Sequence, residues 1–299
     1  MKFKILKWLA RILLLIILIA LIITAYFLIA DIETKLPEKT ENLINIETKQ
    51  FMGRNVFTIT PNNKNENEEN KNTTILYFHG GAYVAEATKQ HWEFLENIVN
   101  DTGATVILPD YPLTPKYNYK DVFQMVVPLY KEIIDKVDTN NLILMGDSAG
   151  GGVGLALEEK ISEEFLPLPT KTILISPWLD VRLNNPEIEE VQKNDKELNK
   201  ETLKLAGVAY AGEDGINSYL VNPIDGNLSR LNNITILTGT YDILNPDTNK
   251  LQQKARDVGV KIQIKEYEKA AHIWMIEKNS SEELINRGYQ DIIELIKNN

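Results

Sequence analysis

The sequence contains no cysteine, only three histidines among 299 residues, and a formal net charge of −10. The lack of cysteine excludes disulfides, a thiol nucleophile and a cysteine zinc site. Three histidines leave few ways to build a metal centre, and we expect neither a metal nor an organic cofactor. A nucleic-acid-binding protein needs a basic face, so the acidic balance argues against a nucleic-acid partner.

An uncharged, mostly apolar run occupies residues 12–30, preceded by three lysines and an arginine. At 1.5 Å per residue this run reaches about 28 Å, close to the thickness of a bilayer core. We therefore predict one transmembrane helix, with residues 1–30 forming a membrane anchor. A cleaved signal peptide, whose apolar core is usually shorter, and a buried helix are the alternatives. The basic cluster favours the cytoplasm, so a single-pass cell-membrane protein with its remainder on the extracytoplasmic side is expected.

The rest of the chain has a length suited to one large α/β domain with a full core. Residues 31–42 form a short polar tether, and the domain is expected over residues 43–299. Two β-rich runs, 43–49 and 55–60, predict a hairpin. The Asn/Glu/Lys-rich stretch 61–72 has nothing apolar to bury and predicts a solvated loop.

From residue 73 onward, apolar strand patterns alternate with helical patterns, which predicts a mostly parallel central sheet with helices on both faces. A long polar segment, residues 182–225, interrupts the alternation and is expected to be a lid or cap insertion. The strands are expected at 73–78, 104–108, 141–145, 171–176, 233–239 and 261–266. The helices are expected near 88–100, 120–136, 149–163, 246–258 and 280–297.

A nucleophile elbow is predicted at Ser148, where an apolar run ends in Gly146-Asp147-Ser148-Ala149-Gly150 and a helical pattern begins. A serine lifted above the end of a sheet sits on a very tight turn, and flanking glycines remove Cβ atoms that would clash there. The alternative is a glycine-rich turn with an idle serine. We favour Ser148 as the nucleophile because suitable partners occur elsewhere in the chain.

The general base should titrate near neutrality, which indicates a histidine. His272 follows the last predicted strand and is the favoured base. His91 lies at the start of a predicted helix among polar residues and is expected to be a solvated surface side chain.

The acid that orients the histidine should lie between the serine and the histidine in the chain, the order that elbow-type hydrolases use. Asp242 stands just after a predicted strand and is favoured. Asp247 is the rival, but it falls in the first turn of the next helix, where an acid interacts favourably with the helix dipole. Asp180 follows the preceding strand and is a weaker candidate.

The oxyanion donors should be backbone N–H groups near the nucleophile. One is expected from Ala149, the residue after the serine. The others are expected from Gly80 and Gly81, which follow the first strand of the alternating region and carry no side chain to obstruct a substrate carbonyl.

Together the motifs resemble the hormone-sensitive-lipase-like serine esterases of the α/β-hydrolase fold. The resemblance covers about residues 73–297 and rests on His79-Gly80-Gly81-Ala82, Asp110-Tyr111-Pro112-Leu113-Thr114-Pro115 and Gly146-Asp147-Ser148-Ala149-Gly150-Gly151, with Ser176-Pro177-Trp178, Asp242-Ile243-Leu244 and His272. It implies carboxylic-ester hydrolysis by Ser148, Asp242 and His272, with His79 shaping its loop and not acting as base.

Two departures from the family pattern bear on structure. Pro112 stands where the family usually has arginine, so an ion pair made by that arginine is expected to be absent. The family's cap is largely N-terminal, whereas here the anchor and tether occupy that region. Residues 182–225 are then the main roof, and their polar composition predicts little apolar surface for a long acyl chain.

The sequence therefore predicts a membrane-anchored serine carboxylesterase acting on small-molecule esters with short-to-medium acyl groups. Two alternatives stay open: an amide or formamide hydrolase using the same residues, and a non-catalytic binding protein of the same fold.

Overall fold

The computed structural model describes residues 33–37, 44–62 and 72–298. The predicted anchor over residues 1–30, and all of the tether except 33–37, lie outside the described residues. Within the described ranges, no helix combines the length and the apolar character needed to cross a membrane.

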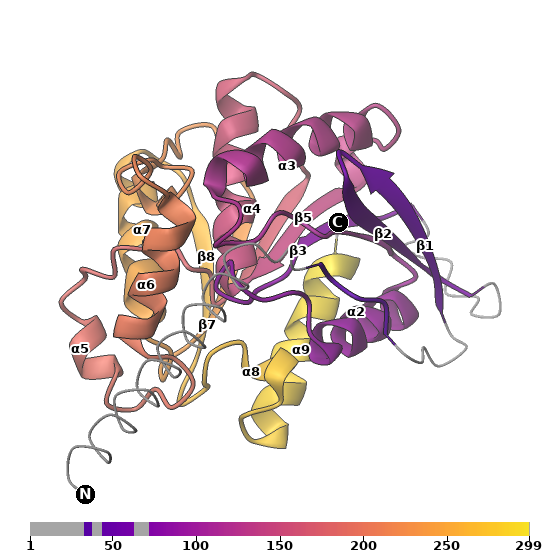
Figure 1. The fold of residues 1–299 in the computed structure, drawn as a ribbon. Helices are drawn as coiled ribbons and strands as arrows, with labels where there is room; N and C mark the ends of the chain where they lie inside the picture. Colours follow the sequence, from indigo (N-terminus) through magenta and orange to yellow (C-terminus); the bar gives the residue numbers. More distant parts are fainter. Residues whose placement is uncertain (1–32, 38–43, 63–71, 299) are drawn as a thin grey trace, which may run out of the picture.

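An eight-stranded sheet runs through the centre of the molecule, with the strand order β1-β2-β4-β3-β5-β6-β7-β8 (Figure 1). β1 and β2 form the predicted antiparallel hairpin, β2 is antiparallel to β4, and the remaining strands are parallel. The strands are β1 (Ile44–Phe51), β2 (Arg54–Pro61), β3 (Thr74–Phe78), β4 (Thr105–Pro109), β5 (Leu142–Asp147), β6 (Lys171–Ile175), β7 (Ile234–Gly239) and β8 (Ile262–Tyr267). The predicted mostly parallel sheet is confirmed, and each predicted strand that follows the hairpin begins and ends within two residues of the observed one.

Helices cover both faces of the sheet because successive side chains of a buried strand point to opposite sides. In β3, Leu76 and Phe78 pack into one core cluster with residues of α3 and α4, while Ile75 and Tyr77 pack into a second with residues of α2 and α9. The helices are α2 (Lys89–Thr102), α3 (Tyr119–Ile134), α4 (Ser148–Glu163), α5 (Ile188–Val191), α6 (Lys200–Ala211), α7 (Asn245–Asp257), α8 (Trp274–Glu277) and α9 (Glu282–Lys297). The five predicted helices correspond to α2, α3, α4, α7 and α9.

The insertion between β6 and β7 contains α5, α6 and a short 3-10 turn at Pro223–Asp225. One side of α6 nevertheless packs into the core. Leu203, Tyr210 and Ala211 of α6 are buried in the same cluster as α3 and α4. Polar residues dominate the composition of the segment, but its apolar residues recur at helical spacing and gather on the inner face of α6.

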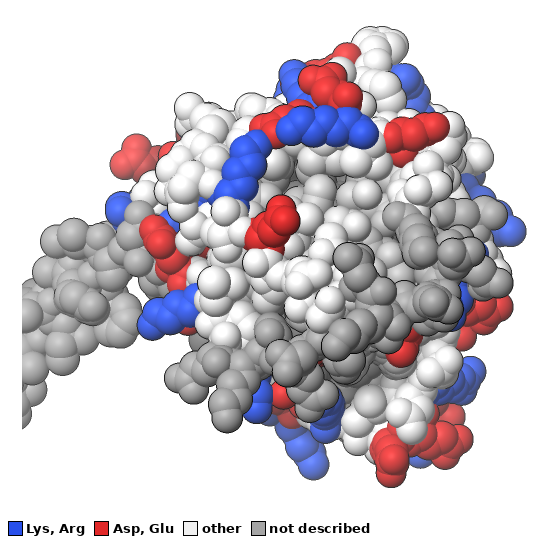
Figure 2. All heavy atoms as spheres, turned by 90° about the vertical axis from the view of Figure 1, so that its right-hand side faces the viewer, with Lys and Arg blue, Asp and Glu red and all other residues white. Residues whose placement is uncertain are grey.

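Charged side chains of both signs are interspersed on the described part of the face shown in Figure 2. Several exposed charged residues of the protein form ion pairs, such as Lys49 with Glu132 and Lys136 with the same carboxylate. Pairs as exposed as these contribute little to the free energy of unfolding.

Candidate active site

Ser148 lies at the turn between β5 and α4, as predicted for a nucleophile elbow. Its backbone has a φ of 51°, a left-handed conformation that is strained for any residue except glycine. The turn brings Gly150 so close to the end of β3 that a Cβ at this position would lie 2.0 Å from the carbonyl oxygen of Phe78. The glycine is therefore required by the packing of the elbow against β3.

The structure brings the three predicted triad residues together from three different loops. The Nε2 atom of His272 lies 2.9 Å from the hydroxyl oxygen of Ser148. Its Nδ1 atom lies 2.9 Å from a carboxylate oxygen of Asp242. Asp242 follows β7 and His272 follows β8, so both side chains reach the serine from the carboxyl ends of neighbouring parallel strands.

The environment of His272 suits a base. Burial alone would lower its pKa, but the negative charge and hydrogen bond of Asp242 outweigh burial and raise the pKa above the usual 6.5. The other oxygen of Asp242 accepts the backbone N–H of Leu244 at 2.9 Å, which fixes the carboxylate in place. Asp242 is completely buried.

The two rival acids are occupied elsewhere. Asp247 accepts a hydrogen bond from the side-chain amide of Asn185 in the insertion, at 2.9 Å. Asp180 forms an ion pair with Arg182, with 2.7 Å between Nε and the carboxylate. The geometry therefore favours Asp242 as the acid, as the sequence predicted.

The expectation that His91 is a solvated surface residue is wrong, because only 2% of it is exposed. Its Nε2 atom lies 3.2 Å from the carboxylate of Asp147, the residue before the nucleophile. Position at a helix start suggested exposure, but α2 packs this first turn against the back of the elbow. Burial would lower the pKa of His91, yet the charge of Asp147 raises it overall.

Asp147 is the centre of a buried polar network beneath the nucleophile. Its carboxylate accepts the hydroxyl of Tyr77 at 2.6 Å and the backbone N–H of Gly80 at 2.9 Å, in addition to its contact with His91. Burial would raise the pKa of Asp147, but His91 and the hydrogen bonds hold it below its usual value. This role of Asp147 was not predicted from the sequence, although an acidic residue directly before the serine is a signal for it.

The assignment of Gly80 as an oxyanion donor is wrong, because its only N–H already points to Asp147. The N–H groups of Gly81 and Ala82 donate to none of the described residues. The N–H of Ala149 belongs to the first turn of α4, where helical N–H groups have no partner within the helix. The N–H groups of Gly81, Ala82 and Ala149 are therefore the candidate oxyanion donors.

Residues 79–88, which we call the glycine loop, are held in an unusual backbone shape. Gly81, Ala82 and Tyr83 have φ values of 114°, 53° and 64°. Strain of this kind persists only where surrounding contacts enforce it. Here the hydroxyl of Tyr111 donates to the carbonyl oxygen of His79 at 2.6 Å. The N–H of Thr114 donates to the carbonyl oxygen of Tyr83 at 2.8 Å.

His79 supports the loop and is not placed to act as a base, as the resemblance implied. Its ring stacks on Tyr111 with the ring centres 4.6 Å apart, and its Nδ1 atom donates to the carbonyl oxygen of Gly80. Burial and the nearby His91 lower its pKa to about 4. The ring is therefore neutral at physiological pH.

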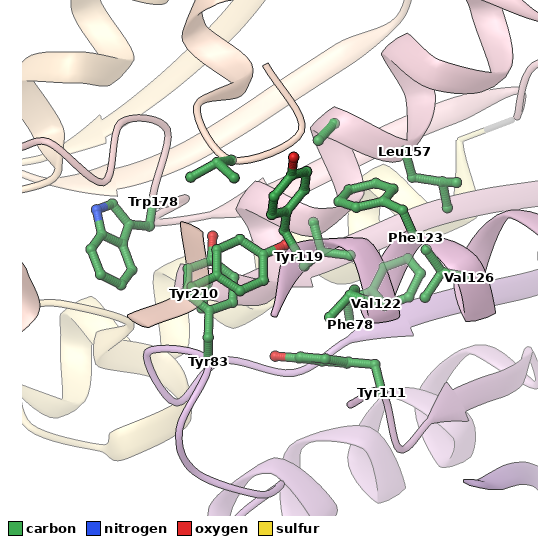
Figure 3. Packing of buried hydrophobic residues seen from close by; sticks show 14 of the residues in the cluster. Phe78, Tyr83, Tyr111, Tyr119, Val122, Phe123, Val126, Leu157, Trp178 and Tyr210 are labelled. Atoms are coloured by element: carbon green, nitrogen blue, oxygen red, sulfur yellow. The ribbon is translucent and has the colours of Figure 1, made fainter. Parts of the chain in front are cut away.

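Aromatic rings connect the glycine loop to the insertion (Figure 3). Tyr210 of α6 stacks on Tyr83, with ring centres 3.6 Å apart and planes 4° from parallel. Tyr83 also stacks on Trp178 at 5.3 Å, and Tyr119 meets Tyr210 edge-on. These rings fill the space between the loop and the insertion.

Asp110 ties the segment after β4 to the hairpin. Its carboxylate lies 3.1 Å from the guanidinium of Arg54, and both side chains are buried. Pro112 stands where the family usually has arginine. Arg54 of β2 nevertheless supplies a cationic partner to Asp110, two residues before that position. Among the residues that the structure describes, no group of three or more His, Asp or Glu side chains is arranged to hold a metal ion.

Residues 75–276 match the α/β-hydrolase-fold family, and the chain belongs to it. It is 29% identical over 196 residues to an esterase of Acinetobacter venetianus, a match covering 64% of each chain. It is 25% identical to an acetyl-hydrolase of Streptomyces hygroscopicus, covering 67% of this chain and 68% of that one. The fold is similar to a hormone-sensitive lipase structure from a metagenome library, with a TM-score of 0.78, 22% identity and coverage of 87% and 85%. The resemblance predicted from the motifs is confirmed.

Proposed function

We propose that the protein is a serine carboxylesterase that hydrolyses esters with short-to-medium acyl groups through an acyl-enzyme. The observation that carries this proposal is the continuous hydrogen-bonded line from Asp242 through His272 to Ser148, with 2.9 Å at each step. This arrangement makes an otherwise unreactive serine hydroxyl nucleophilic. The esterase and acetyl-hydrolase relatives support the same reaction class.

In the first half of the reaction, the Ser148 hydroxyl attacks the ester carbonyl while His272 Nε2 takes its proton. The negative charge that develops on the carbonyl oxygen is stabilised by the N–H groups of Gly81, Ala82 and Ala149. The imidazolium is stabilised by Asp242 and gives its proton to the leaving alcohol. The product left on the enzyme is an acyl ester of the serine.

Water completes the reaction by the same route. His272 takes a proton from the attacking water, and the oxygen of the water bonds to the acyl carbon. The tetrahedral intermediate then expels the Ser148 oxygen, which regains its proton from the imidazolium. A carboxylic acid is released and the resting site is restored without any cofactor.

Short acyl groups are favoured by the aromatic packing above the glycine loop. Tyr83, Trp178 and Tyr210 are at most 1% exposed, so their rings already occupy the space beneath α6. Each additional buried methylene contributes only about 0.8 kcal/mol and must first displace these contacts. We therefore expect the highest kcat/KM for acyl groups of about two to eight carbons.

The membrane location is also part of the proposal and rests on the apolar run of residues 12–30. The positive residues before it favour a cytoplasmic N-terminus, which leaves the catalytic domain on the extracytoplasmic side. Protease added to intact cells should digest that domain while the extreme N-terminus stays protected. A soluble product that begins near Asp31 would instead indicate a cleaved signal.

The activity is tested with the full chain, using matched p-nitrophenyl esters and anilides of increasing acyl length. A fluorophosphonate probe measures nucleophile reactivity separately, with Ser148→Ala as the control that should not react. Faster anilide than ester hydrolysis would favour the amidase alternative. Absence of probe labelling in the folded protein would favour the non-catalytic alternative. A maximum at about twelve carbons or more would contradict the acyl-length argument.

A further inference from the structure

The described part of the tether is docked at the catalytic edge of the sheet. The backbone N–H of Thr34 donates to the carboxylate of Asp110 at 2.9 Å, and its hydroxyl accepts the N–H of Ala87 at 3.3 Å. Thr34 is only 3% exposed. Asp110 follows the carboxyl end of β4, and Ala87 belongs to the glycine loop beside Ser148. The tether is therefore fixed to the rim of the active site.

This contact shortens the effective connection to the apolar run. The run ends at Ala30, four residues before Thr34. An extended chain spans at most about 3.6 Å per residue, so Ala30 lies within about 14 Å of Thr34. A free tether of residues 31–42 would separate the run from the domain by twelve residues, whereas docking at Thr34 leaves only residues 31–33 between the run and the docking point.

Exposed apolar side chains occur next to the docking point in the chain and on α6, which contacts the glycine loop. Leu36, two residues beyond the docking point, is 52% exposed, and on α6 Leu205 and Val208 are 74% and 52% exposed. Leu205 and Val208 are three residues apart and share the outer face of a helix whose inner face holds Tyr210. The stack of Tyr210 on Tyr83 attaches α6 to the glycine loop that also binds Thr34.

We propose that the catalytic rim faces the bilayer directly, with Leu36 and the outer face of α6 resting on the lipid surface. The proposal rests on the membrane anchoring proposed above and adds the orientation of the active site. A bilayer surface fits because the anchor would emerge within about 14 Å of the rim and exposed apolar residues lie beside it. The consequence is that the enzyme draws esters from the lipid–water interface.

The absence of cysteine allows a direct test, because any introduced cysteine is the only thiol in the chain. Full chains carrying Leu36→Cys or Leu205→Cys would be labelled with an environment-sensitive fluorophore and reconstituted into phosphatidylcholine–phosphatidylglycerol vesicles. The matched control is Val258→Cys. Val258 is 53% exposed but lies between the end of α7 and the start of β8, away from the carboxyl ends of the strands where the active site lies. Nitroxide-labelled lipid should quench the first two labels at least twofold more than the third.

Equal quenching at all three positions would overturn the proposal, as would failure of the full chain to float with the vesicles. If the Leu205→Cys label is instead quenched in the absence of lipid by a second copy of the chain that carries a quencher at the same position, the outer face of α6 is assigned to a dimer interface. Turnover of soluble p-nitrophenyl acetate is measured on the same samples. Loss of that turnover with selective lipid quenching retained would refute the esterase activity and leave the orientation supported.

A functional experiment complements the quenching. Leu205→Glu places a charge on the outer face of α6, away from Ser148 and its partners. We expect it to lower hydrolysis of a vesicle-embedded ester at least fivefold while hydrolysis of soluble p-nitrophenyl acetate stays unchanged. Val258→Glu should change neither rate. Equal rates of Leu205→Glu and the unmodified chain on the embedded ester would contradict the proposed orientation.

Discussion

Replacing Asp247 by asparagine should stabilise the protein at neutral pH and leave its activity almost intact. Asp247 is 1% exposed, and one of its carboxylate oxygens has no hydrogen-bond partner. Burial raises its pKa from 3.8 to about 6. The unfolded chain gives up this proton near pH 4, whereas the folded chain retains it to about pH 6, so folding opposes ionisation.

The sign and size follow from this difference. Because the folded state binds the proton more tightly, the free energy of unfolding falls as pH rises from about 4 through 6. At 1.36 kcal/mol per pKa unit, the loss above pH 6 is about 3 kcal/mol. Asparagine retains an oxygen to accept the amide of Asn185 and cannot ionise. Subtracting up to about 1 kcal/mol for the lost charge at the start of α7 leaves a gain of about 2 kcal/mol.

Thermal unfolding at pH 8 is the assay, since a gain of this size corresponds to a Tm increase of roughly 4–8 °C for a domain of this length. The gain should vanish at pH 4, where the native aspartate is protonated. Asp242→Asn is the matched control, with the same chemical change on the triad acid, and its turnover should fall about 10⁴-fold. An Asp247→Asn variant that is less stable at pH 8 would refute the pKa argument. Loss of most activity in that variant would refute the assignment of Asp242 as the acid.

Three further outcomes follow from the same geometry. The charge of Asp242 raises the pKa of His272, and catalysis needs the neutral imidazole. The residual activity of Asp242→Asn should therefore extend to lower pH than that of the native enzyme, as measured on the acid limb of the kcat/KM profile. Gly150→Ala should prevent folding or lower Tm sharply, because its Cβ would lie 2.0 Å from a backbone oxygen. Gly154→Ala is the control: its Cβ would meet nothing nearer than 3.7 Å, and denaturant unfolding should show a gain of about 0.5–1 kcal/mol in the free energy of unfolding. Asp195→Asn should lower kcat about tenfold with little change in KM. The Asp195 carboxylate accepts the N–H of Ile243 at 2.9 Å and so holds the loop that carries Asp242 to the insertion. An unchanged kcat would show that this loop keeps its position without the hydrogen bond.

The sequence determined the sheet, the helices that cover it and the triad. Continuous apolar runs alternating with helical periods require a parallel sheet that is buried on both faces, and this pattern is local. Ser148, Asp242 and His272 could be predicted because each follows a strand, and the carboxyl ends of parallel strands meet at one edge. Position then favoured Asp242 over Asp247, because Asp242 directly follows a strand whereas Asp247 falls in the first turn of the next helix.

Only the tertiary structure decided which polar groups were already occupied. The N–H of Gly80 meets Asp147 across 67 residues of sequence, and His91 meets the same carboxylate across 56. Thr34 meets Asp110 across 76 residues. Contacts of this length depend on how helices and loops pack over the sheet, and the periodicity of a short segment carries no information about them. The occupied N–H of Gly80, the burial of His91 and the fixed tether therefore emerged only once the chain was folded.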